Sequence, residues 1–251
     1  MKPLLDVLSA IGDFTFFAGR ALSASILACA KPGAVVQQLY NVLIGALPLG
    51  TVAGIALGAV VWMHTYSVLQ RTGTVDYLPT VLAAAVLLEL APIGAGLIVA
   101  ARTGASLGAE LGAMKLGEQL DALELLGIPP MRVLVGPRVL ACMLAMPLLH
   151  IYISALALFS GYCAENVVAS SYWLKYQTAC LRELDPVDVI PAALKTVVFG
   201  FLIGVAGCRA GMKAEGGTEG VGKAATSGVV AACLLVLAGA VLLVGLIQAC
   251  K

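Results

Sequence analysis

Long apolar stretches separated by short polar segments dominate the pattern of the chain. Five of these stretches each hold about twenty mainly apolar residues, which is the length that an α-helix needs to cross a bilayer. The pattern therefore predicts an all-α membrane protein with about five transmembrane helices, over residues 42–64, 77–101, 139–164, 187–208 and 228–249.

The first forty or so residues follow a different pattern. Residues 4–30 alternate apolar and polar positions at roughly helical spacing, and Asp6 and Asp13 interrupt the apolar core that a cleaved signal peptide would need. We therefore expect an N-terminal amphipathic helix lying at the membrane surface, in an interfacial segment of residues 1–41 that precedes a membrane domain of residues 42–251. A frayed cytoplasmic tail is the alternative.

Composition supports the membrane assignment and excludes some partners. Hydrophobic residues make up 61% of the chain and charged residues only 12%, against roughly 25% charged residues in a soluble domain. The net charge is +1, so no overall electrostatic field suggests a nucleic acid as a partner.

The distribution of positive charge predicts an orientation. With the N-terminus inside, ten Lys and Arg residues lie in cytoplasmic segments, four lie in outer segments, and Lys195 lies within a span, which accounts for all 15. Cytoplasmic loops are enriched in Lys and Arg. The N-terminus is therefore expected in the cytoplasm and the C-terminus on the outer side.

Glycines recur at four-residue spacing in or beside three predicted spans. Such ridges of small residues allow helix backbones to approach closely in lipid. Packing within the chain is the simpler interpretation, and contact with a second copy is the alternative. The ridges are Gly50, Gly54 and Gly58; Gly104, Gly108 and Gly112; and Gly200 and Gly204.

Residues 110–127, between the second and third predicted spans, are too polar to cross the membrane and too regular for a loose loop. On a single helix, three leucines share one face, while acidic residues and further large apolar residues mix on the other. A face that mixes them is typical of docking rather than of solvation. We expect one cytoplasmic helix that ends at Gly127, just before Pro129 and Pro130. The leucines are Leu116, Leu120 and Leu123, and the opposite face holds Glu110, Leu111, Met114, Glu118, Asp121 and Leu125.

Short motifs follow one another in order over roughly residues 37–250. They are residues 38–42 (QLYNV), 89–92 (ELAP), 101–106 (ARTGAS), 109–115 (AELGAMK), 118–124 (EQLDALE), 137–138 (PR) and 216–226 (GGTEGVGKAAT). Together they resemble the MlaE-type permease family, the membrane subunits of ABC transporters that move phospholipids for MCE-protein systems. The chain departs from the family pattern at Leu88, Ala91 and Ala101, where Arg, Gly and Gly are common. These departures bear on any role that needs an Arg at position 88 and on substrate preference.

The resemblance implies a set of partners. These are a second copy of the permease in a homodimer, separate ABC ATPase subunits, an MCE-domain protein on the outer side and often a STAS-domain protein. ATP and Mg would be used by the ATPase, so no cofactor is expected on this chain. The expected location is a bacterial inner membrane, with a plastid inner envelope as the alternative. The coupling helix to the ATPase would involve Glu110, Leu111, Met114, Lys115, Glu118, Asp121, Glu124 and Leu125.

Candidate residues for a substrate cavity are Glu89, Pro92, Arg102 and Lys195. An ionisable residue within a span is costly and usually faces a cavity or a partner. Glu89 is expected either to contact a lipid headgroup near a dimer axis or to pair with Lys195 or a backbone donor. Arg102, at the inner end of the second span, is expected to anchor on lipid phosphate or to have a more specific role.

Other chemistry is weakly supported. Residues 217–223 approach a P-loop, but Ala224 replaces the Ser or Thr that would ligate magnesium, and no strand precedes them. Cys163 and Cys180 could form a disulfide across one outer loop. No nucleophile–base pair and no metal-ligand spacing around His64 or His150 suggests an enzyme. The sequence therefore predicts a permease subunit without catalysis of its own. The alternative is a stand-alone secondary transporter with a Glu89–Lys195 relay.

Overall fold

Long helices form most of the fold in the computed structural model, which describes residues 2–29, 32–169, 172–182 and 186–249. The regular elements within these ranges are all helical, and five segments are long and apolar enough to cross a membrane. The prediction of an all-α membrane protein with about five spans is confirmed. The candidate spans are Pro32–Thr72, Val75–Leu116, Met131–Val168, Val187–Met212 and Gly217–Ala249.

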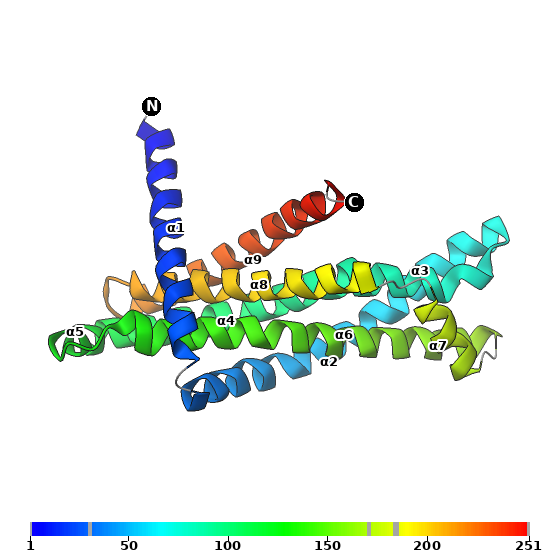
Figure 1. The fold of residues 1–251 in the computed structure, drawn as a ribbon, viewed down its shortest axis with the longest axis horizontal. Coiled ribbons are helices and arrows are strands. Elements are labelled where there is room, and N and C mark those ends of the chain that lie inside the picture. The colour runs from blue at the N-terminus through cyan, green and yellow to red at the C-terminus, as the bar shows by residue number, and fades with distance from the viewer. Residues whose placement is uncertain (1, 30–31, 170–171, 183–185, 250–251) are drawn as a thin grey trace.

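The spanning helices run beside one another along the long axis of the molecule (Figure 1). Helix α2 packs on α6, α4 packs on α8 and α9, and α8 also packs on α6. The α-helices are α1 (Lys2–Ala28), α2 (Pro32–Thr72), α3 (Leu78–Ala85), α4 (Ala91–Leu116), α5 (Gln119–Leu125), α6 (Gly136–Ala169), α7 (Trp173–Leu181), α8 (Pro186–Met212) and α9 (Gly217–Ala249). Helix α5 lies at one end of the bundle, and α3 and α7 lie at the other (Figure 1).

Helix α1 crosses the bundle instead of joining it (Figure 1). It packs against the start of α6, where a Cβ added to Gly136 would meet the backbone of Ala24. Its small residues Ala21, Ala24 and Ala28 are buried, whereas Phe16 and Ile26 are exposed. A helix that lies across the spans with one face exposed fits the predicted interfacial element.

Two five-residue π-helical turns interrupt the regular helices. The first, η2 (Val86–Leu90), joins α3 to α4 inside the second span, and the second, η3 (Met131–Val135), begins the third span. A π-turn inserts a residue into the helical ladder and is frequent at functional sites. The turn η2 carries Glu89, a candidate from the sequence.

The glycine ridges pack within the chain, as the simpler interpretation predicted. In the first ridge, Cβ atoms added to Gly54 and Gly58 would meet α6. In the second, Gly108 faces the backbone of α9 around Ala224, and in the third Gly200 faces the backbone of α6 at Cys142. These close approaches explain why α2, α4 and α8 have their glycines on the faces that contact neighbouring helices.

A methyl group at Gly58 is therefore expected to destabilise the protein, while one at Gly94 is not. A Cβ at Gly58 would overlap the carbonyl group of Ala157, whereas at Gly94 it would meet Leu57 only at 4.0 Å. We expect Gly58→Ala to cost about 1–3 kcal/mol through overpacking. The thermal midpoint of the purified protein in detergent measures this. Equal midpoints for Gly58→Ala and the control Gly94→Ala would contradict the observed packing.

The possible disulfide between Cys163 and Cys180 is not formed, because both thiols are free. Cys180 lies buried in α7 and donates to the carbonyl oxygen of Pro79 at 3.5 Å, whereas Cys163 is exposed. Helix α7 thereby packs against α3, with the buried ring of Tyr176 beside Cys180.

This difference in environment predicts a difference in reactivity. Burial raises the pKa of the Cys180 thiol to about 11, against an opposing hydrogen bond with Tyr176 and with a smaller contribution from the nearby carboxylate of Glu165. At pH 8 the thiol is therefore neutral and inaccessible, and maleimide reacts with the thiolate form. In single-cysteine variants in detergent, we expect rapid maleimide labelling of Cys163 and slow labelling of Cys180. Similar labelling rates would show that α7 does not cover Cys180.

Candidate functional site

The predicted coupling helix of residues 110–127 is two helices and not one. Helix α4 continues to Leu116, and α5 starts at Gln119 after a break at Gly117 and Glu118. Glu118 has a φ of 55°, in the left-handed region that ends a helix. Helical spacing continues through the break, and therefore the apolar pattern alone did not reveal it. The weak signal was Gly117, a poor helix former.

Helix α5 is short but has a well-defined end. The amide of Ile128 donates to the carbonyl oxygen of Leu123, and the amide of Gly127 donates to that of Glu124, both at 2.9 Å. With Gly127 at a φ of 73°, this pair of bonds forms a Schellman motif, which satisfies carbonyls at a helix end. The prediction that Gly127 ends the segment is confirmed. At the other end, an ion pair between Lys115 and Asp121 at 3.0 Å links α4 to α5.

Burial divides the predicted coupling residues into two groups. Leu111 is fully buried against α8, where a Cβ on Gly211 would meet it, and Met114 is half-buried against the core. Their assignment to a docking face is wrong for Leu111 and weakened for Met114, because α4 still packs on the membrane domain at these positions. Leu120 of the predicted opposite face is buried, as expected.

Glu110 is held within the chain. Its carboxylate accepts a hydrogen bond from Ser106 at 2.8 Å and forms an ion pair with Arg138 at 3.4 Å. The buried Arg138 also donates to the carbonyl oxygen of Leu134 at 3.1 Å. Glu110 therefore ties α4 to α6 and orients the end of the bundle from which α5 projects.

The free surface of this region is the tip of α5. Leu125 is 90% exposed and Leu126 is 73% exposed, which is unusual for two adjacent leucines. The side chains of Glu118, Asp121 and Glu124 are also exposed. We call Leu125, Leu126 and these three acidic residues the α5 tip. Leu125 is a residue that the sequence predicts for this surface, and Leu126 is not. Leu126 follows the last residue of α5, and no signal in its own segment of sequence distinguishes it from a core leucine.

A second group of candidates meets inside the membrane domain. Lys195 of α8 donates from Nζ to Glu89 Oε1 and to the carbonyl oxygen of Leu88, both at 2.9 Å. Lys195 is only 5% exposed, and the Glu89 side chain is 44% exposed. Of the alternatives left open for Glu89, pairing with Lys195 is observed. Part of the Glu89 side chain therefore stays exposed, where a lipid or a second copy could contact it.

The four predicted cavity residues lie at two levels of the bundle. Pro92 is buried just after η2 and has no amide hydrogen to donate to the carbonyl oxygen of Leu88, four residues before it; that oxygen accepts from Lys195 instead. Arg102 follows Glu89 by 13 residues, about 20 Å along the helix. It lines a separate cavity of about 120 Å³ with Gln38 and Asn41 of α2. The structure thus brings Glu89 and Lys195 together and leaves Arg102 apart from them.

Comparison with known proteins adds an independent finding. Residues 35–246 match the protein-family model described as Permease MlaE. The chain is similar to a probable ABC transporter permease protein of Rickettsia prowazekii, with 33% identity over 236 residues, covering 94% of this chain and 91% of that protein.

Two further relatives carry more specific names. The intermembrane phospholipid transport system permease protein MlaE of Haemophilus influenzae is 28% identical over 240 residues, covering 94% of this chain and 91% of that protein. The chloroplastic protein TRIGALACTOSYLDIACYLGLYCEROL 1 of Arabidopsis thaliana is 37% identical over 150 residues, covering 60% of this chain and 43% of that protein.

Proposed function

Because the chain belongs to the MlaE permease family, it is a membrane-spanning permease subunit of an ABC transporter, and we propose that its cargo is phospholipid or a related hydrophobic molecule. The name of the Haemophilus relative supports the cargo. The apolar surfaces of the five spans support it too, because they suit a hydrophobic cargo better than a sugar or an ion. ATP hydrolysis is assigned to a separate subunit.

The exposed α5 tip is the observation that carries this proposal. Two leucines at 90% and 73% exposure are costly in water, and each would gain about 1.5–3 kcal/mol on burial in a partner. The carboxylates of Glu118, Asp121 and Glu124 beside them fit basic residues around an apolar pocket. We assign this pocket to the ATPase subunit. The ion pairs Lys115–Asp121 and Glu110–Arg138 would pass the motion of that subunit from α5 into α4 and α6.

Glu89 would lie at the edge of the pathway along which the lipid cargo moves. Two copies of the chain would face each other across an axis, and the exposed edge of Glu89 would meet a headgroup or the second copy. An MCE-domain protein on the outer side would exchange lipid with this pathway, and a STAS-domain protein would bind the ATPase. The Glu89–Lys195 pair also suits a proton relay, so a stand-alone secondary transporter is the second candidate.

The proposed orientation has the N-terminus and the α5 tip in the cytoplasm of a bacterial cell, and the protein in the inner membrane. Cys29, at the end of α1, and Cys163, near the outer end of α6, are both exposed and lie toward opposite ends of the bundle. In intact cells, a membrane-impermeant maleimide is expected to label a variant with Cys163 alone and not one with Cys29 alone. If the variant with Cys29 alone were labelled and the variant with Cys163 alone were not, the orientation would be the opposite of the proposed one.

Co-purification tests the proposed function. The tagged chain, extracted in mild detergent, is expected to bring an ATP-hydrolysing subunit with it, and that subunit should hydrolyse ATP faster in the complex than alone. Transport of a labelled phospholipid in liposomes under an ion gradient, with no ATPase present, would instead favour the secondary transporter.

A further inference from the structure

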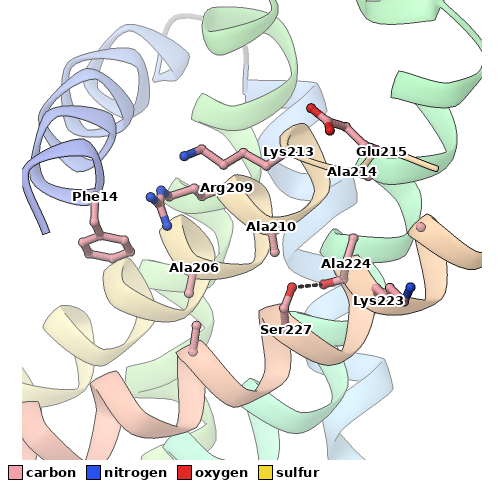
Figure 2. Close-up of a pocket in the computed structure, with 12 residues that line it drawn as sticks. Phe14, Ala206, Arg209, Ala210, Lys213, Ala214, Glu215, Lys223, Ala224 and Ser227 are labelled. Atoms are coloured by element: carbon pink, nitrogen blue, oxygen red, sulfur yellow. Dashed lines mark hydrogen bonds between the residues drawn. The ribbon is translucent and has the colours of Figure 1, made fainter. Parts of the chain in front are cut away.

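A cavity of about 390 Å³ lies where α1, α8 and α9 meet (Figure 2). Neither Glu89 nor a residue of the α5 tip lines it. Phe14 comes from α1, Arg209 from the end of α8, Lys213 from the turn just after it, and Lys223 and Ser227 from the start of α9. The P-loop-like sequence that includes Lys223 forms the first turns of α9, which starts at Gly217; Gly216 and Gly217 both have positive φ. The function proposed above uses none of these residues.

Most of the charged residues that line this cavity are basic. Arg209, Lys213 and Lys223 outnumber the carboxylate of Glu215. Lys213 pairs with Asp13 at 3.3 Å and Lys223 pairs with Glu219 at 2.8 Å, but all four side chains are well exposed. Exposed pairs of this kind hold their partners weakly, so both ammonium groups remain able to contact an anion.

Arg209 is the residue that points most directly to a ligand. Its guanidinium lies over the ring of Phe14, 5.6 Å from the centroid, in an attractive cation–π contact. Its Nε is buried and has no hydrogen-bond partner among the described residues. That nitrogen is closed off from the cavity, but the Arg209 side chain lines the cavity, and the planar donors of arginine match the oxygens of a phosphate group.

The position of the cavity indicates an amphiphilic ligand. It lies beside the turn between the fourth candidate span, which ends at Met212, and the fifth, which begins at Gly217, where the charged ends of both spans meet their apolar parts. Small apolar residues form its other wall, including Ala206, Ala210 and Ala231. From there an exposed aliphatic row continues along α9 into the span, through Val230, Leu234, Leu237 and Val241.

We propose that this cavity binds the phosphate of an anionic phospholipid as a resident ligand, with the acyl chains along α9. The phosphate would accept hydrogen bonds from Arg209 and would be attracted by Lys213 and Lys223. Since Phe14 and Arg209 belong to α1 and α8, a bound lipid would also hold the interfacial helix α1 against the spans. The site is separate from the cargo pathway and does not depend on which molecule is transported.

Lipid binding to the purified full-length chain in detergent tests this proposal. Native mass spectrometry would count the bound lipid during titrations with phosphatidylglycerol, phosphatidylcholine or inorganic phosphate. We expect phosphatidylglycerol to bind, phosphatidylcholine to bind much more weakly, and inorganic phosphate not to compete at equal concentration. Arg209→Gln should weaken phosphatidylglycerol binding about tenfold.

Two other variants make the result specific. Ser227→Phe fills the cavity without changing its charge and should lower phosphatidylglycerol binding as much as Arg209→Gln, even if Arg209→Gln proves unstable. Arg132→Gln removes an exposed arginine beside a different cavity and should leave binding unchanged. An equal loss in Arg132→Gln would show a general attraction to basic surface and overturn the site. Full competition by inorganic phosphate would contradict the proposal that the ligand of this cavity is a lipid.

Discussion

Changing both Leu125 and Leu126 to Asp is expected to remove the ATPase subunit from the purified permease while the permease itself stays folded. Both side chains project from the α5 tip, and their loss leaves the core intact. Burial of two leucines in the partner is worth about 3 kcal/mol or more, so the affinity should fall at least about a hundredfold. The amount of ATPase that co-purifies with the tagged chain measures this.

A matched control separates docking from general damage. Leu181 is also exposed, but it lies on α7 at the opposite end of the bundle. Leu181→Asp should keep the full amount of bound ATPase. If the double variant retained the ATPase with undiminished coupled activity, the α5 tip would not be the docking surface.

Replacing Glu89 with Ala is expected to destabilise the chain by about 3 kcal/mol. The change would leave the ammonium of Lys195, which is 5% exposed, with only the carbonyl oxygen of Leu88 as a partner. Replacing both residues, as Glu89→Ala with Lys195→Met, removes the charge as well as its partner. The double variant should therefore recover most of the lost stability, as a drop and recovery of the thermal midpoint in detergent would show.

The same double variant distinguishes a structural role of the pair from a functional one. The exposed edge of Glu89 implies contact with cargo or with a second copy, so we expect the folded double variant to transport lipid poorly. If it transported lipid at the rate of the unchanged protein, the pair would serve only to join α4 to α8. If the single variant Glu89→Ala were as stable as the unchanged protein, the pairing of Glu89 with Lys195 would not contribute to stability.

The spans could be predicted because their signal is local. Length and apolar content identify them, although the helices extend beyond the predicted limits. For example, α2 covers Pro32–Thr72 where residues 42–64 were expected. A helix can continue its backbone hydrogen bonds into polar residues outside the bilayer. An apolar composition therefore does not show where such a helix ends. The glycine ridges were also predictable, because small residues at four-residue spacing have few other uses.

The site could be predicted only in part, because its details depend on tertiary contacts. The pairing of Glu89 with Lys195 depends on the register between α4 and α8, which the π-turn η2 shifts. Leu111 fits a docking face by spacing alone. Gly211 of α8, however, allows α4 and α8 to approach so closely that the side chain of Leu111 is buried. Neither contact has a signature within its own segment of sequence.

Lipid transfer in proteoliposomes tests the central claim, that this chain is a permease driven by a separate ATPase docked on α5. The permease and its co-purified ATPase would be reconstituted together, and movement of a labelled phospholipid would be followed on addition of ATP and Mg²⁺. We predict transfer that requires both subunits and ATP, and that the Leu125→Asp, Leu126→Asp variant abolishes. Transfer by the permease alone under an ion gradient, unaffected by that variant, would contradict the account.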